Sequence, residues 1–161
     1  MKRLLIFCLL VISGFFIMGG ETVLAAKEKK ALVVVSFGTT FEESRRLDIE
    51  AVESALQKAF PDRDFKRAFT AKIVMKRMLE NQNIKVDDLE TVLNNLQKQG
   101  YSDVLIQSTH LTPGEEYSKK IMTTVHNFKG KFDKIAVGRP LMADAKDYGL
   151  VAIALQTQMP A

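Results

Sequence analysis

The chain has 161 residues, 47% of them apolar, which suits a single domain with a hydrophobic core of its own. Its formal charge of +4 comes from 23 basic and 19 acidic residues. These charges are mixed along the chain, and no basic block is interleaved with aromatic residues. The composition therefore argues against a nucleic-acid-binding protein.

The first 25 residues have the layout of a secretory signal peptide. Lys2 and Arg3 precede the apolar run 4–18, and small residues stand at positions −3 and −1 of a cleavage site after Ala25. An uncleaved membrane anchor is the alternative, but about 15 apolar residues fall short of the roughly 20 that span a bilayer. We expect export to the periplasm, with no stable membrane span after cleavage. The only cysteine, Cys8, lies in this segment, so the domain expected over 26–161 has no thiol for a disulfide or a metal site.

Strands and helices alternate along the rest of the chain. Short runs rich in β-branched or apolar residues predict strands, and apolar residues at helical spacing predict helices. The expected strands are 31–35, 64–70, 102–108 and 134–137, and the expected helices are 41–60, 71–82, 86–99, 115–128 and 144–159. Because strands separated by helices need crossover connections, we expect an α/β fold with a parallel four-stranded sheet and helices on both faces.

The first of these helices illustrates the detail that the pattern predicts. Its expected buried face consists of Ile49, Val52, Ala55, Leu56, Ala59 and Phe60, together with Phe41 at its start. Thr39 or Thr40 is expected to cap its N-terminus, where Glu42 and Glu43 are favoured by the helix dipole. Asp87 and Asp88 are interpreted in the same way, at the start of the helix 86–99.

Three segments fall at the carboxyl ends of predicted strands, where parallel sheets bind ligands. They are Ser36-Phe37-Gly38-Thr39, Phe69-Thr70, and 110–116. The first is rich in small and hydroxyl-bearing residues, and its amides could hold an anionic group; a plain strand-to-helix turn explains it equally well. It lacks the lysine and the glycine spacing of a phosphate loop, which argues against nucleotide binding.

His110 and Glu116 are the chemically interesting residues of the third segment. Neutral imidazole can bind a metal or carry a proton, but a histidine hydrogen-bonded at a strand end is the structural alternative. The second histidine, His126, lies on a predicted helix at no recognised ligand spacing. Glu115 suits a helix start by its charge alone, whereas Glu116 is the neighbour that can turn into a cleft.

Four blocks lie in order between about Lys30 and Pro160: KKALVVVSFGTT, FPDRDFKRAFTAKIVMKRM, LQKQGYSDVLIQSTHLTPGEEY and VGRPLM. Together they resemble the N-terminal half of the anaerobic sirohydrochlorin cobalt chelatases, relatives of the class II ferrochelatases. The resemblance implies insertion of Co²⁺, as substrate metal, into the tetrapyrrole sirohydrochlorin during cobalamin biosynthesis, with no cofactor required. It also implies two similar α/β halves that face each other across a cleft.

The resemblance places the family's metal-binding histidines in the second half, in a Gly-His-Gly turn and a Gly-Asp-His turn. By position within the repeated half, Phe37 and Glu116 replace them here, so those ligands do not carry over. His110 and Glu116 remain the candidate catalytic and metal-contacting residues. The cleft wall is expected to consist of Ser36, Phe37, Gly38, Thr39, Phe69, Thr70 and His110, with Arg67 or Arg139 holding substrate carboxylates.

Three functions stay open on the sequence alone. The chain could be half of a cobalt chelatase that acts with a missing C-terminal half. It could be a half-size chelatase that pairs with a second copy, although the absent Gly-His-Gly turn argues against this. It could also be an exported, non-catalytic tetrapyrrole or metal binder. Nitrogen and oxygen ligands suit cobalt, iron and nickel alike, so the metal is not determined.

Overall fold

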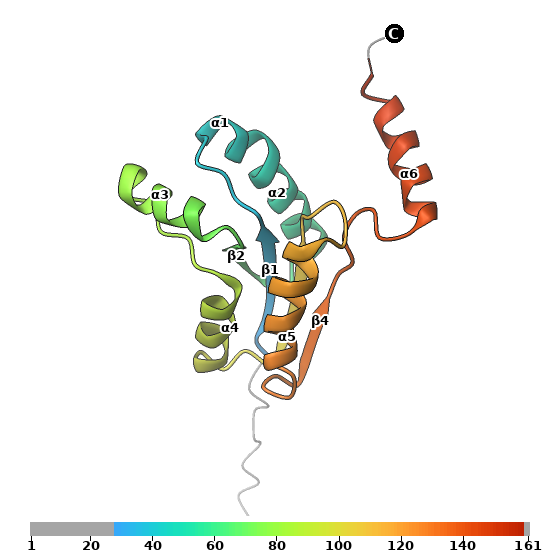
Figure 1. Ribbon diagram of the computed structural model, residues 1–161. Coiled ribbons are helices and arrows are strands. Elements are labelled where there is room, and N and C mark those ends of the chain that lie inside the picture. Colours follow the sequence, from blue (N-terminus) through green and yellow to red (C-terminus); the bar gives the residue numbers. More distant parts are fainter. Residues whose placement is uncertain (1–27, 160–161) are drawn as a thin grey trace, which may run out of the picture.

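The sheet confirms the predicted fold class. A computed structural model of the protein describes residues 28–159, so the expected signal peptide, residues 1–25, lies entirely outside the described residues. Four parallel strands lie in the order β2-β1-β3-β4 (Figure 1). Their bounds are β1 Lys30–Ser36, β2 Asp64–Phe69, β3 Asp103–Ser108 and β4 Lys134–Val137. Each predicted strand is correct to within one residue at either end.

Helical segments connect the strands and follow the last one. Their bounds are α1 Glu42–Ser44, η1 Arg45–Ile49, α2 Glu50–Ala59, α3 Lys72–Gln82, α4 Leu89–Lys98, η2 Glu116–Met122, α5 Thr123–Asn127 and α6 Ala145–Gln156. The segments η1 and η2 are π-helical turns, which the sequence pattern did not predict. α4 begins three residues later than predicted, because the Asp88 carboxylate caps it by accepting the Thr91 N–H at 2.9 Å.

Helices cover both faces of the sheet. Alternate residues of β1 point to one face, where Ala31, Val33 and Val35 share the main core with α4 and with η2–α5. The opposite face carries Val34 and its register partner Arg67. Arg67 contacts Glu53 of α2, so the α1–η1–α2 segment covers this second face.

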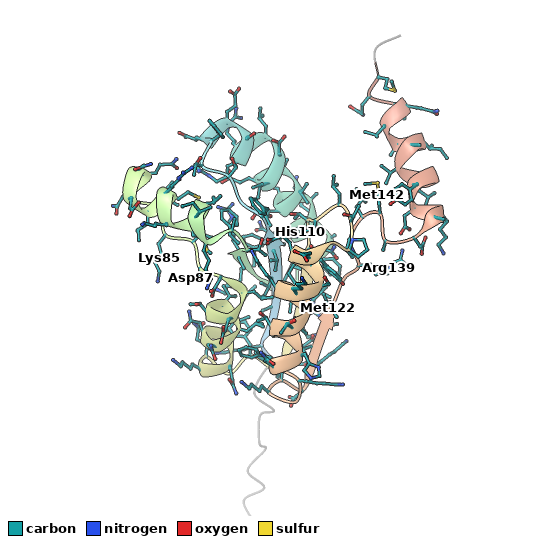
Figure 2. All side chains as sticks on the ribbon, in the orientation of Figure 1. Lys85, Asp87, His110, Met122, Arg139 and Met142 are labelled. Carbon is teal, nitrogen blue, oxygen red and sulfur yellow. The ribbon has the colours of Figure 1, made fainter. Side chains whose placement is uncertain are left out.

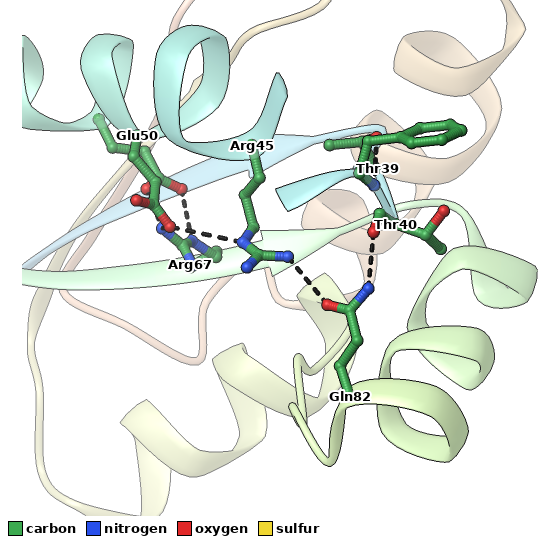
Figure 3. Close-up of polar contacts among 8 residues, drawn as sticks. Thr39, Thr40, Arg45, Glu50, Arg67 and Gln82 are labelled. Carbon is green, nitrogen blue, oxygen red and sulfur yellow. Dashed lines mark hydrogen bonds and ion pairs between the residues drawn. The ribbon is translucent and has the colours of Figure 1, made fainter. Parts of the chain in front are cut away.

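The apolar face predicted for α1–η1–α2 is wrong. Phe41 is 75% exposed and Val52 46% exposed, whereas Arg45 and Glu53 are buried. The Arg67 guanidinium donates hydrogen bonds to Glu53, through Nε at 2.7 Å, and to Glu50 at 3.2 Å. Figure 3 shows Arg67 beside Glu50. Since a buried carboxylate needs a cationic partner, this ion cluster fixes the side of α2 that faces the sheet. The apolar side chains are consequently turned outward.

The last helix, α6, lies apart from the rest of the described chain (Figure 1, red). It begins where predicted, because Asp144 and Asp147 form a capping box. Among residues 28–159, no helix has the length and apolar character needed to cross a membrane.

Candidate functional site

The three segments predicted to meet at the carboxyl edge of the sheet do meet there. Thr70 donates its backbone N–H to the Ser36 carbonyl at 2.9 Å, and Thr109 donates its own to the Val35 carbonyl at 2.9 Å. The Thr109 hydroxyl also donates to Ser36 Oγ at 3.0 Å. These bonds join the ends of β1, β2 and β3, so the segment containing Ser36 is held between the other two.

Gly38 is required by both its backbone and its surroundings. Its φ of +94° is a conformation that L side chains rarely adopt, and an added Cβ would lie 2.5 Å from the Phe69 ring. Phe69 is fully buried, so its ring supports the loop rather than forming an open wall. Phe37 is half exposed beside it. Of these residues, Phe37 is therefore the one that can stack against a bound ligand.

The loop after Gly38 is held in place by a chain of polar contacts (Figure 3). The Thr39 hydroxyl accepts the Phe41 N–H at 3.2 Å, but Phe41 itself is the N-cap residue and no side chain caps the helix, so the predicted threonine cap is wrong. The Thr40 carbonyl accepts from Gln82 Nε2 at 2.6 Å, and Gln82 Oε1 in turn accepts from Arg45 Nη1 at 3.2 Å. α3 and the π-helical turn η1 thus fix the loop from two sides.

His110 is half-buried and presents one ring nitrogen without a partner. Its Nδ1 lies 2.9 Å from Ser108 Oγ, which also accepts the His110 backbone N–H at 3.1 Å. Nε2 is buried and has no hydrogen-bond partner among the described residues. Burial lowers the pKa of His110 and outweighs the nearby Glu116 charge, which raises it. The imidazole is therefore neutral near pH 7, and Figure 2 shows it at the carboxyl end of the strands.

Glu116 turns inward while its neighbour Glu115 does not, as the sequence analysis expected. The Glu115 side chain is 80% exposed and pairs with Lys119, whereas the Glu116 side chain is 30% exposed and pairs with Lys120 at 2.6 Å. Burial raises the pKa of Glu116 and is the largest single influence, but the hydrogen bond and charge of Lys120, together with the neighbouring Thr70 and His110, outweigh it, and the pKa is lowered. Glu116 is therefore ionised near pH 7, and its Oε2 is buried without a partner among the described residues.

Lys120 is a residue that the sequence analysis missed. Its ammonium group contacts Glu116 and also donates to the Thr70 carbonyl at 3.3 Å, which joins the second and third segments. The i, i+4 spacing of Glu116 and Lys120 was the signal that could have predicted the contact.

Arg67 and Arg139, the arginines expected to hold substrate carboxylates, are both paired with carboxylates of the protein. Arg67 is held by Glu50 and Glu53. Arg139 pairs with Asp144 at 2.9 Å and with Asp147 at 2.7 Å. Because both guanidinium groups already have carboxylate partners, neither is available for a substrate carboxylate unless those ion pairs break.

The site therefore combines a neutral imidazole, an ionised carboxylate and a buried hydroxyl. Thr70 Oγ1, His110 Nε2 and Glu116 Oε2 are all buried without partners among the described residues. Such atoms are costly unless a ligand or water satisfies them, and His110 Nε2 and Glu116 Oε2 can accept protons. Within residues 28–159, however, no three His, Cys, Asp or Glu side chains converge to hold a metal ion.

Comparison with known proteins identifies the family of the chain. Residues 30–161 match the family described as cobalt chelatase (CbiK). The chain is 39% identical over 132 residues to the sirohydrochlorin cobaltochelatase of Salmonella typhimurium, covering 82% of this chain and 50% of that protein. It is 27% identical over 135 residues to the sirohydrochlorin cobaltochelatase CbiKC of Nitratidesulfovibrio vulgaris, covering 83% of this chain and 47% of that protein. The chain thus spans about half the length of these curated relatives, and it belongs to the cobalt chelatase (CbiK) family.

Proposed function

We propose that the protein takes part in the insertion of Co²⁺ into sirohydrochlorin, as a chelatase of cobalamin biosynthesis. The names of its curated relatives support this reaction. The observation in the structure that carries the proposal is the pair of unpartnered acceptors, His110 Nε2 and Glu116 Oε2, at the ligand-binding edge of the sheet. Cobalt is a substrate in this reaction, and we propose that no cofactor is required.

The two acceptors suit the proton balance of the reaction. Insertion of a divalent ion into a free tetrapyrrole replaces two pyrrole N–H protons, which must pass to bases. His110 is neutral and Glu116 is ionised near pH 7, because both pKa values are lowered. Each can therefore accept one proton and release it to solvent. The half-exposed ring of Phe37 lies at the same edge and offers an apolar surface for the macrocycle.

We further propose that a second α/β unit completes the site. The described residues contain no group of three metal-ligating side chains, so His110 and Glu116 could supply only part of a coordination sphere. The curated relatives are about twice as long as the span that they share with this chain. Either a further half of that length or a second copy of this chain fits the requirement.

Two measurements test the proposal. Fluorescence quenching measures sirohydrochlorin binding, and the absorbance change on metal insertion measures turnover against the uncatalysed rate. We expect binding by the chain, little insertion at low protein concentration, and an insertion rate that rises more than linearly with protein concentration if two copies form the site. Replacing His110 or Glu116 should weaken binding or insertion, whereas His126→Ala, an exposed histidine on α5, is the matched control.

Failure to bind sirohydrochlorin would reject the proposal. Tight binding with no insertion, at any protein concentration and with a second family half supplied, would instead support a non-catalytic tetrapyrrole binder. This second function is favoured by one observation, the absence of three converging metal ligands within residues 28–159.

A further inference from the structure

Lys120 of η2 places a positive charge among the acceptor atoms of the site. Its ammonium group contacts Glu116 Oε1 at 2.6 Å and donates to the Thr70 carbonyl at 3.3 Å. The other carboxylate oxygen of Glu116 is buried and has no hydrogen-bond partner within residues 28–159. The ammonium group is therefore a cation that the carboxyl edge of the sheet already holds, beside acceptors that it does not satisfy.

The acceptors around this ammonium group are of the kind that bind a divalent transition-metal ion. A carboxylate, a carbonyl oxygen and a neutral imidazole are all ligands that Co²⁺ accepts. His110 belongs to the same group of atoms: burial lowers its pKa most, and the nearby charge of Glu116 raises it. Its Nε2 is buried without a partner among the described residues. A doubly charged ion in place of the ammonium group would therefore find acceptors on more than one side.

Lys120 is held loosely enough to be displaced from Glu116. Its side chain is 51% exposed, and ion pairs in contact with solvent are weak. A cavity of about 180 Å³ opens beside it, between η2 and the start of α4, and Asp88 and Glu90 line this cavity. A lysine carries its charge on a flexible four-carbon stem. An ammonium group that leaves Glu116 therefore has both solvent and a carboxylate-lined cavity next to it.

We propose that Lys120 is a positioning residue: its ammonium group holds the Glu116 carboxylate in place before Co²⁺ arrives, and the ion displaces it. The inference rests on the proposed function, because it takes Co²⁺ as the ion that reaches this edge of the sheet. Competition with the ammonium group weakens the hold of Glu116 on the metal. Weak retention suits a substrate metal that must pass to a tetrapyrrole, since tight binding in the ground state does not accelerate the transfer.

Titration of the whole chain with Co²⁺ alone, without a tetrapyrrole, tests the displacement. Calorimetry measures the affinity, and the paramagnetic broadening of backbone NMR signals over residues 116–120 locates the ion. We expect Lys120→Met to bind Co²⁺ about fivefold more tightly than the wild type, because the ion no longer has to break an ion pair. Lys120→Arg keeps the charge and can bind a carboxylate through two N–H groups, so it should bind Co²⁺ no more tightly than the wild type.

Lys119→Met is the matched control. It removes the same charge from the same segment, but the partner of Lys119 is Glu115, whose side chain is 80% exposed. Solvent and salt screen a charge in that position, so we expect the affinity for Co²⁺ to stay within about twofold of the wild type. A gain confined to position 120 would therefore arise from the contact with Glu116 and not from the net charge of the chain.

Two more variants connect the effect to the carboxylate and to the lost charge. Adding Glu116→Gln to Lys120→Met should abolish the gain, because the group for which the ion and the ammonium compete is then absent. Lys120→Gln is neutral and keeps a donor for the Thr70 carbonyl, so it should show the same gain as Lys120→Met. It replaces the methionine variant if circular dichroism shows that Lys120→Met is not folded. A purely structural role for Lys120 would not make any of its variants bind Co²⁺ more tightly.

The results separate this inference from the proposed function. Unchanged or weaker Co²⁺ binding in the folded neutral variants of Lys120 would overturn the displacement, and so would the absence of Co²⁺ binding in the wild type and all variants. Sirohydrochlorin binding and insertion, measured separately, test the proposed function. Binding and insertion without the gain would reject only the displacement, whereas the gain in a chain that does not bind sirohydrochlorin would support the displacement and reject the proposed function.

Discussion

At the scale of single residues, the site depends on which polar atoms are left without partners. His110 uses Nδ1 for a contact with Ser108, and its Nε2 has no partner within residues 28–159. Glu116 uses one carboxylate oxygen for Lys120, and the other has no partner in the same part of the chain. A side chain that served packing alone would be expected to satisfy both of its polar atoms. The free atoms are therefore the reason to assign binding roles to these two residues.

His110→Ala should change function more than stability. The substitution removes only the Ser108 contact of the ring, and Ser108 Oγ keeps the backbone N–H of residue 110 as a donor. We expect the free energy of unfolding to change by less than about 1 kcal/mol. Co²⁺ or sirohydrochlorin binding, measured by calorimetry, should weaken. A loss of several degrees in thermal midpoint with unchanged binding would identify His110 as a structural residue.

The pH dependence of binding follows from the same residue. Because burial lowers the pKa of His110 below its ordinary value of about 6.5, the ring stays deprotonated to a lower pH than a free histidine does. Proton competition with Co²⁺ should therefore begin below about pH 6.5 in wild-type protein and be reduced in His110→Ala. Folding stability has the same sign: it falls as the pH decreases through this range, because the unfolded histidine binds its proton more readily.

Gly38→Ala should destabilise the protein more than the same substitution at Gly100, a glycine that has a positive φ but no close neighbour. Gly100 also has a positive φ, of +76°, but an added Cβ there meets no atom within 4 Å. We expect Gly100→Ala to cost about 1 to 2 kcal/mol from backbone strain. Gly38→Ala should add about 1 to 3 kcal/mol, because its Cβ would clash with the Phe69 ring. Urea unfolding of both variants measures the difference, and equal costs would rule out the clash.

At the scale of secondary-structure elements, buried ion pairs determine how the pieces join. Arg67 binds α2 to β2, and Arg63 binds the start of β2 to β3. Arg63 donates to both carboxylate oxygens of Asp103, at 3.0 and 2.8 Å. The π-helical turns η1 and η2 supply Arg45 and Lys120, which contact Gln82 and Thr70 on neighbouring elements. Polar contacts between elements thus set positions that apolar periodicity did not predict.

Arg63→Met should be strongly destabilising at neutral pH. It would leave the Asp103 carboxylate, whose side chain is 6% exposed, without its cationic partner, a change that typically costs about 3 to 5 kcal/mol. Lys76→Met, which removes one partner of an exposed pair with Glu80, is the matched control and should cost less than about 1 kcal/mol. Thermal or urea unfolding measures both. Similar costs for the two variants would contradict this account.

Lowering the pH should reduce the difference in free energy of unfolding between Arg63→Met and the wild type. The hydrogen bonds from Arg63 lower the pKa of Asp103, so this contribution is present above the unfolded carboxyl pKa of about 3.9 and is lost as pH falls through the lower folded value. In the variant, burial of an unpaired carboxylate favours its protonated form. Unfolding curves collected between neutral pH and pH 3 should therefore converge.

At the scale of the whole molecule, an α/β body carries a site at one edge and a separate apolar helix. The site has two proton acceptors but lacks a full set of metal ligands within the described residues. α6 stands apart from this body, with Leu150 and Ile153 exposed. Both features are explained if the working molecule contains two α/β units. The curated relatives, of which this chain covers about half, are long enough to contain two such units.

Export remains a prediction at this scale. Lys2, Arg3, the apolar run 4–18 and Ala25 form a complete signal layout. We expect the processed protein to begin at Ala26 and to be recovered from the periplasm. N-terminal sequencing of fractionated cells measures this. A protein that kept Met1 in a soluble cytoplasmic fraction would reject the signal peptide.

Much of the fold follows from local sequence patterns. The four strands, their parallel arrangement and the capping of α4 and α6 by Asp88 and Asp144 agree with local signals, since strand runs, crossover lengths and caps involve residues close in sequence. The meeting of Ser36, Thr70 and His110 at one edge also followed, because parallel strands end on the same side of a sheet. Of the neighbouring carboxylates Glu115 and Glu116, the sequence analysis expected Glu116 to be the one that turns inward.

The sequence by itself therefore determined the family, the strand order along the chain and the edge at which the site lies. Only the tertiary structure decided that Val52 and Phe41 face outward, that Arg67 and Arg139 are occupied by carboxylates, and that α6 stands apart. The physical reason is that each depends on partners from other elements. An amphipathic pattern identifies an apolar face but does not identify which surface covers it, and here buried ion pairs, rather than apolar contacts, hold α2 against the sheet.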